Sequence, residues 1–424
     1  MNQPALKPDA APTSPILDQL RSLLAGRTEE VTAWMDARRM ESGAPFYSSV
    51  DLRHAGYKLA PVDTNLFPAG FNKLSAAARQ RAALHARARF TRCQQAVTRV
   101  LLIPENHTRN QGYLDNLGAL KGVLEAAGAE VVIGSLAAQA GQPIALTTST
   151  GEDLLQQPLV RERSMLATES GFVPQLIVLN NDLTSGLPEM LRGVSQPIQP
   201  RPSQGWHRRR KSIHFDAYSK LVREFADAFG IDPWLIDSVS HKCGRVNFGE
   251  RQGLECVAMG VEKVLHHVRS KYAEYGITDT PYVYVKSDAG TYGMGIMTVQ
   301  SGDEMLELNK KLRNKMNIIK EGVQSTEVVI QEGIPTRDVV QGAPAEPMLY
   351  LMDGHAVGGA YRINRERDAQ GNLNATGMEF VGMCDEGEAG AAQMPSCHFG
   401  ALGLIAELAS LAAPREEYGE SYSI

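Results

Sequence analysis

The chain has 424 residues, of which 43% are hydrophobic and 21% charged, and its formal net charge is −5. This length predicts two or three packed domains rather than one hydrophobic core, and the composition is that of a globular protein. The net negative charge argues against a general binder of nucleic acid or of a membrane surface, and no apolar run reaches the roughly 18–20 residues that cross a bilayer.

The N-terminal residues 1–15 contain Pro, Ala, Asp and Thr without a continuous apolar stretch, so we expect a flexible tail and no secretory signal. The five cysteines are scattered, odd in number and without metal-ligand spacing. Reduced thiols in a cytoplasmic protein are the natural interpretation. These cysteines are Cys93, Cys243, Cys256, Cys384 and Cys397.

The next region, residues 16–98, is expected to be a helical and loop region that helps to bind substrate. Leucine and isoleucine recur at helical spacing from residue 16 to about residue 40. Residues 48–74 are expected to be rich in loops. Residues 75–97 are rich in Ala and Arg and predict a second helix.

The pattern then changes to one typical of an α/β domain. Residues 99–104 and 129–133 predict buried strands, and residues 113–127 between them predict a helix, which is the size of a parallel strand–helix–strand unit. A third strand, 175–179, leads into the polar loop 180–186. Loops at the carboxyl ends of parallel strands are where open α/β sheets bind ligands.

A domain boundary is predicted at residues 197–205, which contain three prolines and one glycine. It separates an α/β domain, residues 99–200, from a C-terminal domain, residues 201–424. Two helices are expected after it, at about 215–229 and 253–275.

The most informative segment is a strand, residues 281–286, followed by a glycine-containing loop and a second short strand, 296–299. Glycines allow backbone N–H groups to approach an anion closely, and Lys286 at the strand end adds a positive charge. A Walker A loop and a dinucleotide-binding fingerprint both fail on pattern, which leaves another class of nucleotide site or an ordinary hairpin. The loop glycines are Gly290, Gly293 and Gly295.

Downstream of this loop the sequence predicts more β structure. Residues 326–334 form a β-rich run, and residues 346–364 read as two strands joined at Asp353-Gly354, a strong hairpin signal. Residues 370–377 form a second loop of small residues.

This order of elements resembles the ATP-grasp superfamily. The resemblance implies the fold class α/β (α+β): an ATP-grasp fold with an N-terminal pre-ATP-grasp-like parallel α/β domain. It also implies that Lys286 and Arg362 are catalytic, the latter by neutralising the transferring phosphate, and that residues 331–334 form a hinge that binds adenine. The implied ATP-binding residues are Lys286, Ser287, Gly290, Gly293, Gly295, Gln331, Glu332, Gly333 and Ile334.

One part of the ATP-grasp pattern is missing, because no Glu-X-Asn metal signature follows the second loop. A Mg²⁺ ion keeps much of its coordination in water and phosphate oxygens, so one or two carboxylates from the protein suffice. The candidate magnesium ligands are Glu346, Asn374, Asp385 and Glu386.

A narrower resemblance joins the N-terminal half to proteobacterial glutamate–cysteine ligases that are similar to glutathione synthetase. It is carried by residues 61–72, 103–110 and 205–215. Within the ATP-grasp resemblance, the loop 371–377 is similar to the substrate loop of bacterial glutathione synthetase. The narrower resemblance implies that ATP and Mg²⁺ activate the γ-carboxylate of glutamate as an acyl phosphate, which the amine of cysteine attacks in the first step of glutathione biosynthesis. No protein nucleophile is needed. The expected substrate-binding residues are Asp63, Asn65, Arg209, Lys211, Asn372 and Asn374.

Several of these residues have a plainer interpretation. Asp63 and Asn65 also favour turns. The basic run 206–211 is either a solvated loop or, as we favour, an anion-binding segment at the entrance to the nucleotide domain. A nucleic-acid role for this run conflicts with the acidic chain and the lack of aromatic stacking platforms.

Two other functions stay open on the sequence alone. One is an ATP-grasp ligase for another amino acid or a small peptide, and the other is a nucleotide-binding regulator without turnover. The sequence predicts small-molecule substrates and a cytoplasmic location, and it leaves the oligomeric state open, a homo-oligomer included.

Overall fold

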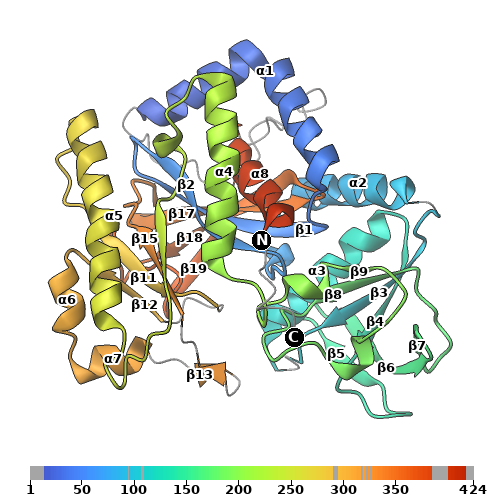
Figure 1. Ribbon diagram of the computed structural model, residues 1–424. Coiled ribbons are helices and arrows are strands. Elements are labelled where there is room, and N and C mark those ends of the chain that lie inside the picture. The colour runs from blue at the N-terminus through green and yellow to red at the C-terminus, as the bar shows by residue number, and fades with distance from the viewer. Residues whose placement is uncertain are drawn as a thin grey trace.

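The protein is described by a computed structural model that covers residues 14–93, 95–106, 109–289, 295–316, 319–320, 323–324, 327–383 and 400–416. Within these residues the chain forms three sheets of four or more strands, surrounded by helices (Figure 1). None of the helices described combines the length and the apolar character needed to cross a membrane.

The seven-stranded sheet, at the lower right of Figure 1, contains the predicted parallel unit. Its elements are β3 (Arg99–Pro104), α3 (Gln111–Ala126), β4 (Glu130–Ser135), β5 (Ile144–Thr147), β6 (Asp153–Glu162), β7 (Met165–Thr168), β8 (Leu176–Asn180) and β9 (Ile198–Gln199). Strands β4, β3 and β8 pair in parallel and α3 connects β3 to β4, so the strand–helix–strand prediction is confirmed.

Both faces of this sheet are covered. Val100 and Leu102 of β3 pack toward α3 and the preceding helix α2 (Ala76–Arg92), whereas Leu101 and Ile103 pack into a separate cluster on the opposite face. This alternation follows from the period of two along a strand, and burial on both faces explains why β3 reads as a continuous apolar run.

The four-stranded sheet carries the glycine-loop hairpin. Its strands are β10 (Ser240–Cys243), β11 (Val283–Ser287), β12 (Ile296–Val299) and β15 (Val328–Glu332). They pair antiparallel in the order β10-β15-β11-β12, and helix α5 (Leu254–Tyr275) packs against them. The predicted strands and the helix at 253–275 are therefore confirmed. Smaller elements follow β12: α6 (Gly302–Leu306), α7 (Lys310–Met316), β13 (Ile319–Lys320) and β14 (Val323–Gln324).

The six-stranded sheet joins the two ends of the chain. Its strands are β1 (Tyr47–His54), β2 (Leu59–Asn65), β16 (Val339–Val340), β17 (Ala343–Met352), β18 (His355–Asn364) and β19 (Met378–Gly382). They run in the order β19-β18-β17-β1-β2, with β16 beside β17. The hairpin predicted at Asp353-Gly354 is confirmed. The expectation of loops over residues 48–74 is wrong for β1 and β2, because pairing with β17 extends this segment into the sheet.

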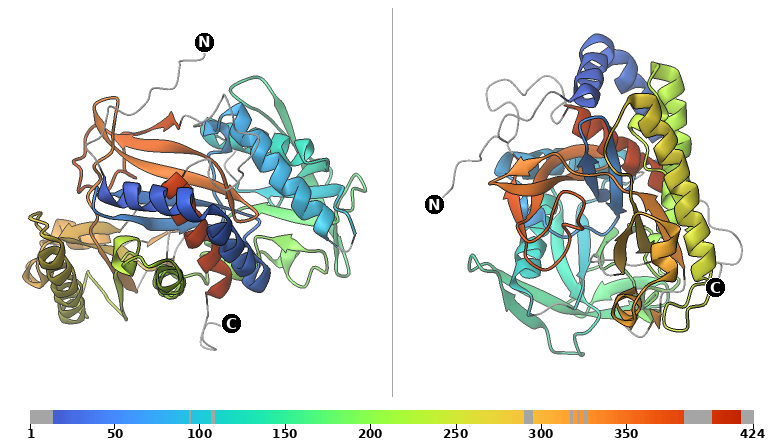
Figure 2. Two further views of the ribbon diagram at one scale, coloured as in Figure 1. Left: turned by 90° about the horizontal axis from the view of Figure 1, so that it is seen from above. Right: turned by 90° about the vertical axis from the view of Figure 1, so that its left-hand side faces the viewer.

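Three helices cover one face of the six-stranded sheet: α1 (Pro15–Ser42), α4 (Lys211–Phe229) and α8 (Gly400–Ala412). Figure 2 shows α1 and α8 close together against this sheet. The 3-10 turns in the described part of the chain are η1 (Phe71–Lys73), η2 (Glu189–Leu191), η3 (Pro202–Gln204), η4 (Pro233–Leu235) and η6 (Ala413–Arg415). The helices predicted at 16–40, 75–97 and 215–229 are confirmed with boundaries shifted by a few residues.

Candidate active site

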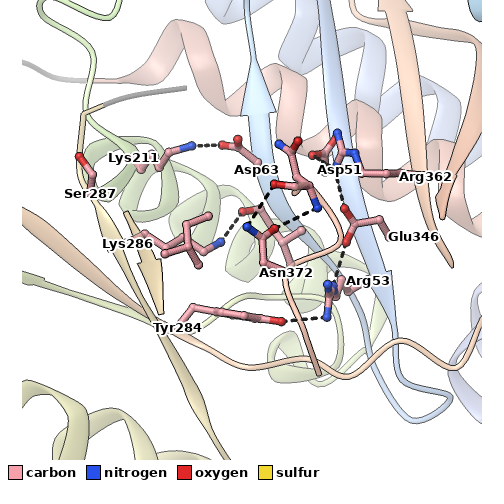
Figure 3. A pocket seen from close by; sticks show the side chains of 13 residues that line it. Asp51, Arg53, Asp63, Lys211, Tyr284, Lys286, Ser287, Glu346, Arg362 and Asn372 are labelled. Atoms are coloured by element: carbon pink, nitrogen blue, oxygen red, sulfur yellow. Dashed lines mark hydrogen bonds and ion pairs between the residues drawn. The ribbon is translucent and has the colours of Figure 1, made fainter. Parts of the chain in front are cut away.

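A cavity lies where the four-stranded and six-stranded sheets meet, and Figure 3 shows polar side chains from both sheets converging on it. The start of α4 and the loop before β19 complete its walls. The cavity is lined by Asp51, Arg53, Val62, Asp63, Lys211, Tyr284, Lys286, Ser287, Ile296, Glu346, Arg362, Asn372 and Asn374.

Two lysines form the cationic wall. Lys286, at the end of β11, is only 8% exposed, and its Nζ donates to Gln331 Oε1 at 2.5 Å and to the carbonyl of Val62 at 3.1 Å. Burial, together with the neighbouring charge of Lys211, lowers the pKa of Lys286 to about 8. Lys211, the first residue of α4, forms an ion pair with Asp63. Both ammonium groups are therefore positioned where an anion entering the cavity would meet them.

Three carboxylates form the opposite wall. Asp51 on β1 and Asp63 on β2 are cross-strand partners, so both point into the cavity from neighbouring positions. Glu346 on β17 lies opposite Arg362 on β18. The Arg362 guanidinium bridges two of these acids, with Nη1 2.7 Å from Asp51 Oδ2 and 2.5 Å from Glu346 Oε1.

The charges on this wall compensate one another. Burial raises the pKa of Asp51, which the charge of Arg362 opposes. Burial also acts to raise the pKa of Glu346 and of Asp63, but nearby cations prevail in both cases. Arg53 and Arg362 lower the pKa of Glu346, and Lys211 lowers the pKa of Asp63 to about 2. Glu346 and Asp63 are thus held ionised by cations that can also bind phosphate, whereas the pKa of Asp51 remains raised.

The donor set of this wall fits a hard divalent cation. Asp51, Asp63 and Glu346 offer carboxylate oxygens, and the amide of Asn374 also lines the cavity. Within the described residues no group of three or more His, Cys, Asp or Glu side chains is placed to hold a metal ion, and each of the three carboxylates is paired with a cation. Two of the expected metal ligands, Asp385 and Glu386, lie outside the described residues.

The four hinge residues differ in where their side chains point. Gln331 is buried and bonds Lys286, whereas the Glu332 carboxylate points away to a buried ion pair with Lys58, 2.6 Å from its Nζ. Gly333 leaves no room for a side chain, because an added Cβ would lie 2.2 Å from the Tyr282 ring. Ile334 packs with Ala55, Ala60 and Val62. The backbone of this stretch is already hydrogen-bonded: the N–H groups of Glu332 and Gly333 donate to the carbonyls of Val239 and Tyr282, both at 2.8 Å, and the Ile334 carbonyl accepts from Arg53.

The glycine-containing loop between β11 and β12 is described only at its two ends, up to residue 289 and from residue 295. Ser287 lines the cavity, and its N–H donates to the carbonyl of Gly295 at 3.1 Å, which closes the base of the hairpin. Asp288 anchors the loop to α4 by accepting from the N–H and the hydroxyl of Ser212, both at 2.7 Å. Gly290 and Gly293 lie outside the described residues.

Among the expected substrate-binding residues, four line the cavity: Asp63, Lys211, Asn372 and Asn374. The side chain of Asn65 instead accepts from the N–H of Phe67 at 2.9 Å, the turn-forming role that the sequence had left open. Arg209 is 1% exposed and does not line the cavity. It forms an ion pair with Glu416 and donates to the carbonyl of Thr64 at 2.5 Å, so it supports β2 from behind.

The sequence analysis missed three polar lining residues, Asp51, Arg53 and Tyr284, and the apolar Val62 and Ile296. A signal for two of them was present: in Val50-Asp51-Leu52-Arg53 apolar and charged residues alternate with the period of a strand. This alternation predicts two buried apolar side chains on one face and two charged side chains together on the other.

The chain is similar to known proteins over nearly its whole length. The family model GshA, glutamate–cysteine ligase, matches residues 21–417. A crystal structure from Methylobacillus flagellatus KT, a protein provisionally assigned as a gamma-glutamylcysteine synthetase, is 43% identical with a TM-score of 0.87, and the match covers 98% of this chain and 99% of that one. No curated protein sequence matches the chain at a significant level.

Two more distant structures are also similar. A glutathione synthetase-like effector from Globodera pallida is 10% identical over 85% of this chain and 82% of that one, with a TM-score of 0.38. D-alanyl-alanine synthetase A from Vibrio cholerae is 12% identical over 63% of this chain and 67% of that one, with a TM-score of 0.27.

The family model and the 43% identical structure span nearly the whole chain. The fold is accordingly a mixed α/β fold of the ATP-grasp kind, with the glycine-loop hairpin facing an antiparallel sheet. The chain belongs to the glutamate–cysteine ligase family, enzymes that join glutamate to cysteine with ATP.

Proposed function

We propose that the cavity between the four-stranded and six-stranded sheets is where this ligase makes γ-glutamylcysteine. The observation that carries the proposal is the pairing of walls: Lys286 and Lys211 on one side face Asp51, Asp63 and Glu346 on the other. Phosphoryl transfer to a carboxylate brings several negative oxygens together, so it requires fixed positive charge before the reaction begins.

ATP is proposed to enter from the glycine-loop hairpin. Residues 331–334 are proposed to border the adenine, and Ser287, which lines the cavity beside Lys286, is proposed to contact the phosphates. Lys286 then exchanges its present acceptors, Gln331 and the Val62 carbonyl, for phosphate oxygens. A bound phosphate keeps Lys286 protonated, since an opposite charge favours the charged form.

The cation is proposed to be Mg²⁺, held by oxygens of Asp51, Asp63 and Glu346. Their hard carboxylate donors suit it, and when bound it neutralises charge on the phosphates. In the structure Lys211 is paired with Asp63 and Arg362 with Asp51. A cation bound by these acids would neutralise their charge, so that Lys211 and Arg362 could turn toward phosphate.

The chemistry then needs two transfers. A γ-carboxylate oxygen of glutamate attacks the γ-phosphorus of ATP, and ADP leaves. The amine nitrogen of cysteine, after losing a proton, attacks the acyl carbon, and the C–O bond to phosphate breaks. Arg362 lies where it can stabilise charge on the transferring group, and Asn372 and Asn374 offer amides for the amino-acid substrates.

We also propose that the enzyme acts in the cytoplasm on small molecules alone, without nucleic-acid partners. The net charge of −5 supports this proposal, since a nucleic acid would repel the molecule as a whole.

The direct test is phosphate release from ATP and Mg²⁺ with glutamate and a panel of amine acceptors, with mass spectrometry of the product. A γ-glutamylcysteine mass that appears only with cysteine, and that is lost in the Lys286→Ala variant, supports the proposal. Turnover that prefers another acceptor would mean that the amine substrate is not cysteine. Full turnover in Lys286→Ala would mean that the active site is not in this cavity.

A further inference from the structure

Arg53 is a buried arginine that bonds four segments of the site at once. It lies on β1, is 2% exposed and lines the cavity (Figure 3). Its guanidinium donates to Glu346 Oε2 at 3.0 Å, Tyr284 Oη at 2.9 Å, and the carbonyls of Ile334 at 3.3 Å, Ala369 at 3.1 Å and Gly371 at 2.6 Å.

Each acceptor belongs to a part of the site with its own task. The Ile334 carbonyl ends the hinge of residues 331–334. The Ala369 and Gly371 carbonyls open the loop that carries Asn372 into the cavity, and the Glu346 carboxylate is on the acidic wall. The nucleotide side, the substrate loop and the candidate metal ligand therefore share one donor.

Tyr284 gives the same loop a second attachment. Its hydroxyl accepts from Arg53 and donates to the carbonyl of Gln370 at 2.5 Å. The turn of residues 369–371 is thus bound through three successive backbone carbonyls. Backbone carbonyls are fixed parts of the chain, so bonds to them set the position of the loop rather than the rotamer of a side chain.

Arginine suits this set of acceptors, with the two hydrogens of Nη1 shared among Tyr284, Ile334 and Ala369. Its guanidinium carries five N–H donors in a rigid planar fork, whereas lysine has three donors on a flexible stem. A lysine at this position keeps the charge beside Glu346 but cannot reach the hinge and the loop together.

We propose that Arg53 is a positioning residue for the ligase reaction: it fixes the loop of residues 369–374 against the hinge, so that loop, nucleotide and acidic wall are aligned before substrates bind. Misplacement of reacting groups by about 1 Å costs on the order of 100-fold in rate, so alignment of this kind acts on kcat. The proposal rests on the assignment of the cavity as the active site.

The test compares Arg53→Lys with two other variants. Tyr284→Phe removes the second attachment of the loop only. Arg39→Lys is the matched control, because Arg39 forms an ion pair with Glu407 between α1 and α8, with side chains 10% and 3% exposed, and does not line the cavity. Turnover, the KM of each substrate, thermal stability and hydrogen exchange of the amides in residues 369–377 are measured for all three.

We expect Arg53→Lys to lower kcat by about 10- to 100-fold with each KM changed less than about threefold, and to speed amide exchange in residues 369–377. Tyr284→Phe should produce the same changes at smaller size, and Arg39→Lys should lower the melting temperature alone.

Three results would overturn the inference: unchanged exchange in the loop, unchanged kcat, or a rise in the KM of a single substrate, which would mean that Arg53 binds that substrate directly. Hydrogen exchange needs no turnover, so this test is decided even if the cavity is not the active site. A failure of that assignment appears separately, as unchanged ATP binding in Lys286→Ala.

Discussion

The two sheets that face the cavity are assembled from the chain in different ways. The four-stranded sheet takes its strands from residues 240–332, a continuous part of the sequence. The six-stranded sheet pairs β1 and β2, at residues 47–65, with β17, at residues 343–352. Lys286, which we propose faces the phosphates, comes from the first sheet, and the acids Asp51 and Asp63 come from the second.

The different assembly of the two sheets explains the origin of the acidic wall. No Glu-X-Asn signature follows the substrate loop, yet the cavity does not lack acids, since two carboxylates from the N-terminal strands occupy it. The six-stranded sheet also joins residues 16–98 to residues 201–424, which the sequence analysis assigned to separate regions. Half of the site is therefore encoded locally, and half exists only after the two ends of the chain have paired.

The largest expected effect is on the local half. Lys286→Ala should weaken ATP binding and lower kcat/KM by about 100-fold or more, because it removes the buried cation from the phosphate side. Calorimetric titration with an ATP analogue measures the binding, and circular dichroism checks that the fold is intact. Lys271→Ala, which removes a lysine paired with Asp232 elsewhere, is the control. Unchanged ATP affinity in Lys286→Ala would contradict the assignment.

The second prediction concerns the acids that β1 and β2 contribute to the site. Asp51→Asn and Asp63→Asn should each raise the Mg²⁺ concentration needed for half-maximal activity by about 10- to 100-fold. Asp353→Asn is a matched control, because Asp353 is also buried and paired with arginines, Arg89 and Arg92, but lies at the far turn of the hairpin. Equal Mg²⁺ dependence in all three variants would show that these acids do not hold the cation.

An element of the fold could be predicted from the sequence where the residues that determine it lie close together in the chain. The β11–β12 hairpin and the Asp353-Gly354 turn have their signals within a few residues, and both were predicted. Strand β2 contains Pro61, Asp63 and Asn65, residue types that disfavour strands, so its segment was taken as a loop. Pro61 is accommodated where the register with β1 shifts, beside Leu52.

The C-terminal helix α8 and the ion pair behind β2 show the same limit. Helix α8 is buried almost all round, so it has no polar face that would give a helical period, and no element was expected there. Arg209 was expected to bind substrate because it belongs to a basic run. Its partner Glu416 is 207 residues away, and only the folded chain brings the two together.

A smaller effect is expected on the pH dependence of ATP binding. The pKa of Lys286 is about 8, so its ammonium is charged below this pH and loses its proton above it. ATP affinity should therefore begin to fall as the pH rises through about 8, by at most about tenfold per unit. Lys286→Arg keeps its charge and should flatten the profile. Titrations between pH 6.5 and 9.5 would measure both, and identical profiles would exclude Lys286 as the titrating group.

The smallest effect on catalysis is expected behind β2. Burial acts to raise the pKa of Glu416, but the charge of Arg209 and the hydrogen bond to His214 lower it to about 2. Since the folded-state pKa is depressed below the ordinary 4.5, the stabilisation is complete above that value and is lost as the pH falls through about 2. Glu416→Gln should lower the free energy of unfolding at pH 7 by about 1–3 kcal/mol, with much less loss at pH 2–3. Denaturant unfolding at both pH values measures this difference, and an equal loss at both would contradict the ion-pair explanation.

The most direct test of the composite site is to locate the cation. Crystals grown with Mn²⁺ in place of Mg²⁺ and a non-hydrolysable ATP analogue would give an anomalous signal at the metal. Our account predicts this signal between Asp51, Asp63 and Glu346, beside phosphates that contact Lys286. A metal held instead by Asp385 or Glu386, with Asp51 and Asp63 still paired to Arg362 and Lys211, would contradict it.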